Sequence, residues 1–133
     1  MAADDSATIT RDRVDLLRRC IDRVRETTAG LRYELLVIDN DSHDPETLAY
    51  LDDLAAEGHQ VVRYPHEFSF ARQVDLGALH ARGDLMLVLN NDTQLADNVL
   101  HELHRALDRD RAIAAAGAVS NEVKGHAQIE VGR

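Results

Sequence analysis

The chain has 133 residues, of which 44% are hydrophobic, so it is long enough for one domain with its own core and too apolar for wholesale disorder. Its formal net charge of −9 argues against a nucleic-acid-binding surface, which is normally basic. The single cysteine, Cys20, excludes an intrachain disulfide, and its place in a helical apolar repeat predicts a buried, inert thiol.

The first half of the chain alternates helix and strand signals. Residues 1–9 are small, polar and acidic and are predicted to form a loose segment. Apolar residues at helical spacing predict a helix over residues 12–25, and the apolar run 35–38 predicts a short buried strand. Asp44 as N-cap and Pro45 at the first helical position then predict the start of a second helix.

The second half continues this alternation. Residues 61–62 mark a strand, residues 69–82 a third helix, and residues 85–89 a strand that is expected to be buried on both faces because it is apolar throughout. Residues 99–107 predict a fourth helix. The small-residue segment 113–119 fits a strand or a helix almost equally well, and both remain alternatives.

Strands that alternate with helices predict βαβ units with right-handed crossovers, and therefore an α/β fold with a mostly parallel sheet and flanking helices. We expect one domain over residues 10–120 and an irregular C-terminal segment over residues 121–133. No repeat, low-complexity tract or internal linker divides the chain.

Polar clusters follow two of the predicted strands. Residues 39–42 read Asp-Asn-Asp-Ser, and residues 90–93 read Asn-Asn-Asp-Thr. Ligands of open α/β sheets bind beyond the carboxyl ends of the strands, and adjacent parallel strands would bring both clusters to one edge. Carboxylate and amide oxygens there suit a base, a ribose or a hard divalent cation. Asp, Asn and Ser are also common turn and capping residues, so only the coincidence of two clusters favours a binding site.

Three motifs stand in a fixed order. Residues 37–45 read Val-Ile-Asp-Asn-Asp-Ser-His-Asp-Pro, residues 68–77 read Phe-Ser-Phe-Ala-Arg-Gln-Val-Asp-Leu-Gly, and residues 85–93 are an apolar strand that runs into Asn-Asn-Asp-Thr. Together they resemble family 2 glycosyltransferases of the GT-A fold. That family shows Val-Asp-Asn/Asp-Gly-Ser with Thr/Asp-Pro, then Phe-Asn-Phe-Ser-Arg-x-Asn-Asn-x-Gly. An apolar strand that runs into Asn-Asp/Asn-Asp-Thr, the family's version of the Asp-x-Asp motif, comes third. Residues 33–107 thus resemble its Rossmann-like nucleotide-binding half.

The resemblance implies a role for each matching residue on the nucleotide side. Asp39 would accept a hydrogen bond from the base, with Asn40 nearby and Thr10 lining the base pocket. Arg72 would approach the base or the diphosphate, a task suited to a fixed cationic fork. The full implied nucleotide-sugar-binding set is Thr10, Asp39, Asn40, Arg72, Asn90 and Asn91.

The resemblance also implies a metal cofactor, Mg²⁺ or Mn²⁺. Asp92 would ligate the cation that bridges the diphosphate, and Asn90 would face the ribose. The metal would neutralise the charge that develops on the leaving nucleoside diphosphate. Asn90 stands where the family has the first aspartate of Asp-x-Asp, so one carboxylate remains where two are usual. Asp41 stands where glycine is usual and would need a left-handed turn conformation, which aspartate tolerates.

The two ends depart further from the family. Residues 6–9 are a poor substitute for the family's first strand, and the chain stops before the acceptor-binding half that supplies the catalytic base. We therefore expect a donor-binding module truncated at both ends, whose catalytic base is unknown and which shows weak or no turnover alone. Its partners would be a nucleotide diphosphate-sugar, a glycan or lipid-linked acceptor, and a second chain or domain that supplies the acceptor half.

Three hypotheses follow. The first is a metal-assisted, inverting glycosyltransferase acting in cell-wall or polysaccharide biosynthesis. The second is a non-catalytic nucleotide-binding or interaction module of the same fold. The third and weakest is a receiver-like signalling domain, for which Lys124 would have to serve at a late strand end. No apolar run approaches the roughly 20 residues that span a bilayer. The expected location is therefore cytoplasmic, with peripheral attachment at the inner membrane face as a compatible variant.

Overall fold

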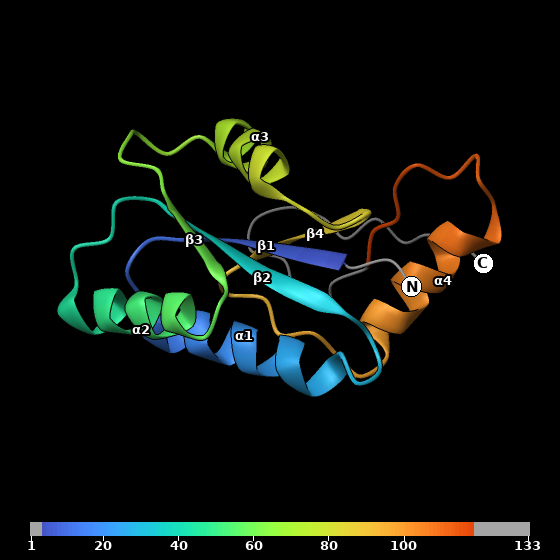
Figure 1. Cartoon of the computed structure of the whole chain (residues 1–133), viewed down its shortest axis with the longest axis horizontal. Helices are drawn as coiled ribbons and strands as arrows, with labels where there is room; N and C mark the ends of the chain where they lie inside the picture. The colour runs from blue at the N-terminus through green and yellow to red at the C-terminus, as the bar shows by residue number, and fades with distance from the viewer. Residues whose placement is uncertain (1–3, 119–133) are drawn as a thin grey trace, which may run out of the picture. The chain divides into compact units, whose positions relative to one another are not determined.

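The computed structural model describes residues 4–118, which belong to two compact units, one ending at Ala96 and the next beginning at Asp97. The first unit contains four strands and three helices (Figure 1): β1 (Asp4–Thr10), α1 (Val14–Thr27), β2 (Tyr33–Asp39), α2 (Pro45–Ala56), β3 (Gln60–Arg63), α3 (Phe70–His80) and β4 (Leu85–Asn90). The second unit contains α4 (Val99–Arg109).

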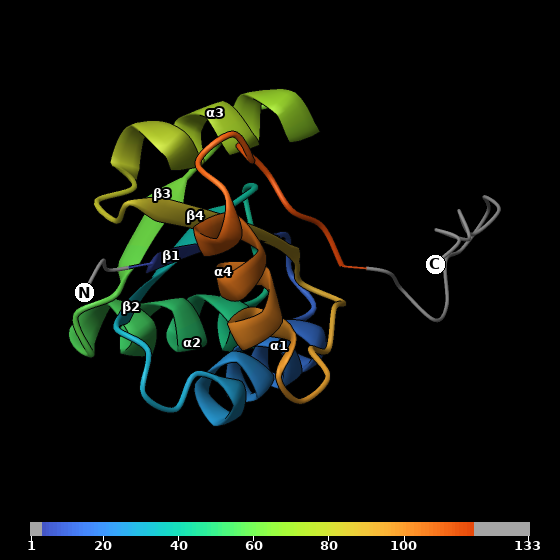
Figure 2. The ribbon, with the colours of Figure 1, turned by 90° about the vertical axis from the view of Figure 1, so that its right-hand side faces the viewer.

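The strands of the first unit form one parallel sheet in the order β3-β2-β1-β4. Helices α1 and α2 lie against one face of this sheet and α3 lies against the other (Figure 2). The predicted α/β class with flanking helices is confirmed. The parallel arrangement matters for function, because it brings the carboxyl ends of all four strands to the same edge.

Strand β1 corrects the expectation of a loose segment over residues 1–9. Asp4–Thr10 is a central strand, paired with β2 on one side and with β4 on the other. The acidic and small residues at its start have low strand propensity, so the local sequence signal is weak. Pairing on both sides outweighs that propensity. Residues 6–9 therefore do supply the strand for which the sequence looked a poor substitute.

The core has one layer on each face of the sheet. On the α3 face, Ile9, Leu36, Ile38 and Tyr64 form a buried cluster, against which Val74 and Leu76 of α3 pack. Successive strand residues point to opposite faces, so Leu35 and Val37 belong to the α1 and α2 face. There they are fully buried, as are Leu17, Ile21 and Leu54 of the two helices.

Helices α2 and α3, which begin near the carboxyl edge, have side-chain N-caps, and the cap at Asp44 is the one that the sequence predicts. The Asp44 carboxylate accepts hydrogen bonds from the backbone N–H and the hydroxyl of Thr47, both at 2.9 Å, and Pro45 is the first residue of α2. The Ser69 hydroxyl accepts a bond from the Arg72 N–H at 3.4 Å at the start of α3. Each cap satisfies a backbone donor that the helix itself leaves unpaired.

Two expectations about the later part of the chain need correction. Leu85–Asn90 is half-buried for most of its length, because β4 is an edge strand of the described sheet and pairs with β1 alone. Residues 113–118 are neither strand nor helix. Residue 119 and the predicted irregular segment 121–133 lie outside the described residues.

The fourth helix is confirmed, and it begins at Val99 with its apolar residues at the predicted spacing. None of its residues is buried. Among the helices that the structure describes, none is long and apolar enough to cross a bilayer.

Candidate functional site

The carboxyl ends of β2, β1 and β4 present the predicted polar residues along one edge of the sheet. Thr10 is the register partner of Asp39, and Ile9 is the partner of Asn90. The two polar clusters therefore share an edge, as expected. They do not follow adjacent strands, however, because β1 lies between β2 and β4.

Thr10 connects the two clusters. Its carbonyl oxygen accepts a hydrogen bond from the Asn40 N–H at 2.7 Å. Its hydroxyl accepts one from the Asn91 side-chain amide at 3.2 Å and donates to the Asp12 carbonyl at 3.5 Å. Thr10, which is expected to line a base pocket, is itself buried. Its hydrogen bonds join the ends of β2 and β4.

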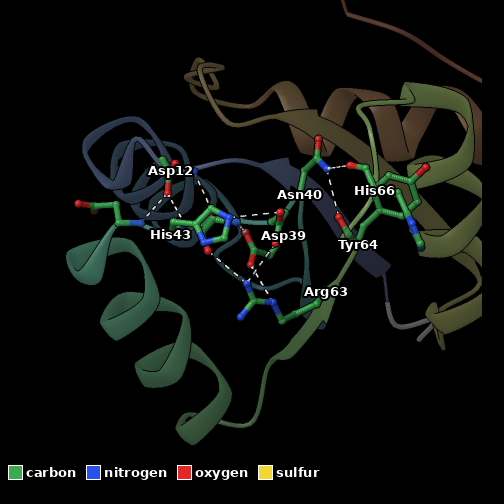
Figure 3. A network of polar contacts seen from close by, with 10 residues as sticks. Asp12, Asp39, Asn40, His43, Arg63, Tyr64 and His66 are labelled. Atoms are coloured by element: carbon green, nitrogen blue, oxygen red, sulfur yellow. Dashed lines mark hydrogen bonds and ion pairs between the residues drawn. The ribbon is translucent and has the colours of Figure 1, made fainter.

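Asp39 is fully buried, yet one of its two carboxylate oxygens has no hydrogen-bond partner in the part of the chain that the structure describes. Its Oδ1 accepts a bond from the Ser42 N–H at 3.2 Å, whereas Oδ2 accepts none from the described residues. The nearest cation is Arg63 of β3, whose Nε lies 3.6 Å from Oδ2 (Figure 3). That distance makes an ion pair but is too long for a good hydrogen bond. Buried polar atoms are almost always paired, so Oδ2 marks a position where a ligand could donate.

Asn40 uses its side chain to hold the segment that follows β3. Its Nδ2 donates to the carbonyl oxygens of Tyr64 at 3.1 Å and His66 at 2.9 Å (Figure 3). Its Oδ1 is buried and has no partner among the described residues. The structure thus places Asn40 beside Asp39, as the sequence implies, and shows that its amide nitrogen has a structural task.

The loops after β1 and β2 are tied together through Asp12. Its Oδ1 accepts hydrogen bonds from the N–H groups of His43 and Asp44, both at 2.8 Å, and its own N–H donates to the Ser42 hydroxyl at 2.7 Å. The bonds from Asp44 and His43 lower the pKa of Asp12 below its ordinary value of 3.8. Asp41 adopts a left-handed φ of 59°, which confirms the turn conformation expected of it in place of glycine.

Replacing Asp12 with asparagine is expected to lower stability at neutral pH and to reduce the loss of stability in acid. Because the pKa of Asp12 is lower in the folded state, its stabilising contribution is complete above about pH 3.8 and is lost as the pH falls through the folded value. Urea unfolding of both proteins from neutral pH downwards would measure this. The difference in unfolding free energy should shrink in acid, and a difference that is constant with pH would contradict the assignment.

The end of β4 combines exposed polar side chains with a buried thiol. Asn90 and Asp92 are exposed, and the Cys20 Sγ of α1 donates to the Asn90 carbonyl at 3.6 Å. Burial, with a smaller contribution from the Asp92 carboxylate, raises the pKa of Cys20 to about 11. The prediction of a buried thiol is confirmed, and this thiol is protonated at neutral pH.

The donor set at this edge fits a cation that is shared with a ligand. Among residues 4–118, no three histidine, cysteine, aspartate or glutamate side chains gather into a group that could hold a metal ion. Mg²⁺, however, is commonly bound through one or two carboxylates together with the phosphates of a substrate. Asp92, exposed at the end of β4, with the Asn90 amide two residues earlier, is compatible with that mode of binding.

Arg72 lies on the first turn of α3, exposed and apart from the carboxylates. It lines a shallow surface depression of about 360 Å³ together with Arg63, Tyr64 and His66. Two cations thus face the same depression. Among the described residues Arg72 makes no hydrogen bond or ion pair with Asp39 or Asp92, so its expected approach to a base or diphosphate stays a prediction.

Arg63 is a residue of the site that the sequence motifs do not single out. It is the register partner of Asp39 and also lies 3.9 Å from Asp41. The sequence contains a signal for it, because Arg63 directly follows residues 61–62, which predict a strand. Its significance depends on β3 lying next to β2, which hydrophobic periodicity does not reveal.

Comparison with known proteins adds a family match. The model of the family described as glycosyl transferase family 2 matches residues 7–129. The O-antigen biosynthesis protein RfbC of Myxococcus xanthus is 33% identical over 87 residues, which are 65% of this chain and 7% of that protein. The uncharacterized protein y4gI of Sinorhizobium fredii is 25% identical over 112 residues, which are 82% of this chain and 12% of that protein.

Two solved structures share the fold. The mannosyltransferase PcManGT from Pyrobaculum calidifontis, in complex with GDP-Man and Mn²⁺, superposes with a TM-score of 0.68 at 18% identity. TarS residues 1–349 from S. aureus superposes with a TM-score of 0.67 at 13% identity. Each likeness covers 80% of this chain and 32% of the other. The GT-A fold is thereby confirmed, and the receiver-like alternative loses its support; Lys124 lies outside the described residues.

Proposed function

The chain belongs to glycosyl transferase family 2, and we propose that it binds a nucleotide diphosphate-sugar together with a divalent metal for transfer of the sugar to a glycan or other acceptor. The observation that carries this proposal is the buried Asp39 Oδ2, which accepts no hydrogen bond from the described residues. It lies at the carboxyl edge of a parallel sheet, where the ligands of such sheets bind. An N–H donor of a nucleotide base would satisfy it.

Different residues of the site contact different parts of the nucleotide-sugar. Asp39 accepts from the base, while Thr10 holds the ends of β2 and β4 together beside it. Asn90 and Asn91 follow β4 on the ribose side. Arg72, in the depression next to the segment that Asn40 holds, approaches the base or the diphosphate. In this arrangement the nucleoside diphosphate, which is the leaving group of the transfer, lies at the end of β4.

Asp92 is the proposed metal ligand, with Mg²⁺ or Mn²⁺ as the cation. When bound, the metal neutralises charge on the departing nucleoside diphosphate. The complex of PcManGT with GDP-Man and Mn²⁺ supports a guanosine diphosphate-sugar and manganese as the first pair to try. Asp92 contributes one exposed carboxylate, so binding of the metal should depend on the diphosphate being present.

The chain spans 7% and 12% of the two curated relatives and 32% of the two structural neighbours. Inverting transfer, a glycan or lipid-linked acceptor and a second domain or chain that supplies the catalytic base are therefore parts of the proposal. The O-antigen relative supports a surface polysaccharide as the acceptor class. A non-catalytic nucleotide-binding module is the alternative, favoured by Asn90 in the place of an aspartate.

Calorimetry with UDP, GDP and dTDP, each with and without Mn²⁺, tests the proposal. At least one nucleotide should bind, more tightly with Mn²⁺, and Asp92→Ala should remove the effect of Mn²⁺ while leaving weak binding. Asp52→Ala is the matched control, because Asp52 is an exposed carboxylate on α2. No binding of any nucleotide would refute both the enzyme and the nucleotide-binding module. Hydrolysis or transfer from a nucleotide-sugar then separates those two.

A further inference from the structure

We propose that Arg63 is a positioning residue for nucleotide recognition, which fixes and charge-compensates the Asp39 carboxylate while leaving its Oδ2 open to the base. This inference rests on the proposed function and adds a residue to it. Arg63 lies outside the three sequence motifs. It comes from the geometry at the end of β3.

The guanidinium of Arg63 is held by the loop that follows β2. Its Nη2 donates to the Ser42 carbonyl oxygen at 3.2 Å and lies 3.9 Å from the Asp41 Oδ1. Register pairing of Asp39 with Arg63 places the two residues side by side across the sheet (Figure 3). Two interactions hold the Arg63 guanidinium beside the Asp39 carboxylate: the pairing of β3 with β2 and the hydrogen bond to the Ser42 carbonyl.

Arg63 compensates the charge of Asp39 without occupying its acceptor. Its Nε is 3.6 Å from Oδ2, and Oδ2 accepts no hydrogen bond from the described residues. A buried carboxylate with no cation nearby is costly, whereas one in a close hydrogen-bonded pair has no acceptor left for a ligand. At the observed spacing the negative charge of Asp39 is compensated by Arg63, and its Oδ2 can still accept a hydrogen bond from a ligand.

The surroundings make this role specific to Arg63. Further ionisable side chains of this loop network are Asp41, His43, whose Nε2 lies 3.3 Å from the Asp41 Oδ2, and Asp12, whose Oδ1 accepts from the His43 N–H (Figure 3). Two of these three are acidic, so removal of Arg63 would leave Asp39 among like charges. The side chain of Arg63 is 53% exposed, which moderates the size of the effect through solvent screening.

A double-mutant cycle on nucleotide binding tests the proposal. With the nucleotide that the wild type binds best and Mn²⁺, Arg63→Met should weaken binding about tenfold, equal to about 1.4 kcal/mol. In an Asp39→Asn background the same change should have little effect, because the charge that Arg63 compensates is gone. Binding of Mn²⁺ with pyrophosphate, which lacks a base, should not change in any variant.

Two further variants separate charge compensation from structure. Arg63→Lys keeps a cation near Asp39 and should restore most of the affinity that Arg63→Met loses. Arg82→Met is the control, because Arg82 pairs with Glu34 at 2.6 Å near the other end of β2. It should bind like the wild type. Melting temperatures of all variants report folding, and Arg63→Gln replaces Arg63→Met if the latter does not fold.

The outcomes are distinguishable. A wild type that binds no nucleotide refutes the proposed function itself. A wild type whose binding depends on Asp39, together with folded Arg63 variants of unchanged affinity, refutes only the role of Arg63. Equal losses from Arg63→Met in both backgrounds, or no recovery in Arg63→Lys, would also overturn it.

Discussion

Replacement of Leu36 by alanine is expected to lower the free energy of unfolding by about 2–5 kcal/mol. Leu36 is completely buried in the centre of β2, in the cluster that joins the sheet to α3. The shortened side chain loses its apolar contacts and leaves a cavity, because Ile9, Ile38 and Tyr64 are held by the sheet and relax only in part. Urea unfolding followed by circular dichroism measures the change.

The chain offers a matched control for that experiment. Leu79 of α3 is 82% exposed, so the same leucine-to-alanine change there should alter stability by less than about 0.5 kcal/mol. Equal losses at the two positions would mean that the α3 face of the sheet is not packed as described. The comparison thus tests the core independently of any ligand.

Replacement of Asn40 by alanine is expected to cost about 2–4 kcal/mol, because it removes two hydrogen bonds at once. The carbonyl groups of Tyr64 and His66 would lose the amide that now donates to them. The segment from Tyr64 to His66 lines the depression next to Arg72, so nucleotide affinity should fall along with the melting temperature. Thermal unfolding and calorimetry on the same samples measure both effects.

Asn91→Ala is the control for the asparagine variant. Asn91 is half-buried and its amide makes one side-chain bond, to the Thr10 hydroxyl at 3.2 Å, so its loss should cost about 1 kcal/mol. A stability loss from Asn40→Ala no greater than that from Asn91→Ala would contradict the tethering role of Asn40. A large loss of affinity without a change in stability would instead make Asn40 a direct ligand contact.

Periodicity and capping residues predict most of this fold because their signals are local. The run 35–38 is apolar throughout, and Asp44 with Pro45 marks the start of a helix; the structure contains both elements. Strand β1 is not predicted by such local signals, because its sequence begins Asp-Asp-Ser-Ala. Its stability comes from pairing with β2 and β4, two strands that follow later in the chain. The half-buried state of β4 follows from its place at the edge of the sheet, which composition does not encode.

The candidate site likewise has some features that the local sequence predicts and others that depend on the fold. Asp39 and Asp92 could be picked out because turn residues after an apolar run are visible in sequence, and the structure puts both at the carboxyl edge. The contact of Arg63 with Asp39 depends on strand order and register. The use of the Asn40 amide to hold residues 64–66 depends on how a loop returns to the sheet. Neither is a property of a local pattern.

The position of β1 also has a consequence for the order in which the molecule assembles. β1 precedes every other strand, yet it lies between β2 and β4, and the bond from Asn91 to Thr10 joins residues 81 positions apart. Contacts that close such long loops form late, because the entropy of closure must be met before they contribute. We therefore expect the β4 half of this edge to be completed last in folding. A nucleotide bound as proposed, in contact with both halves, would bind only the finished sheet, and by mass action it would stabilise that state against opening at β4.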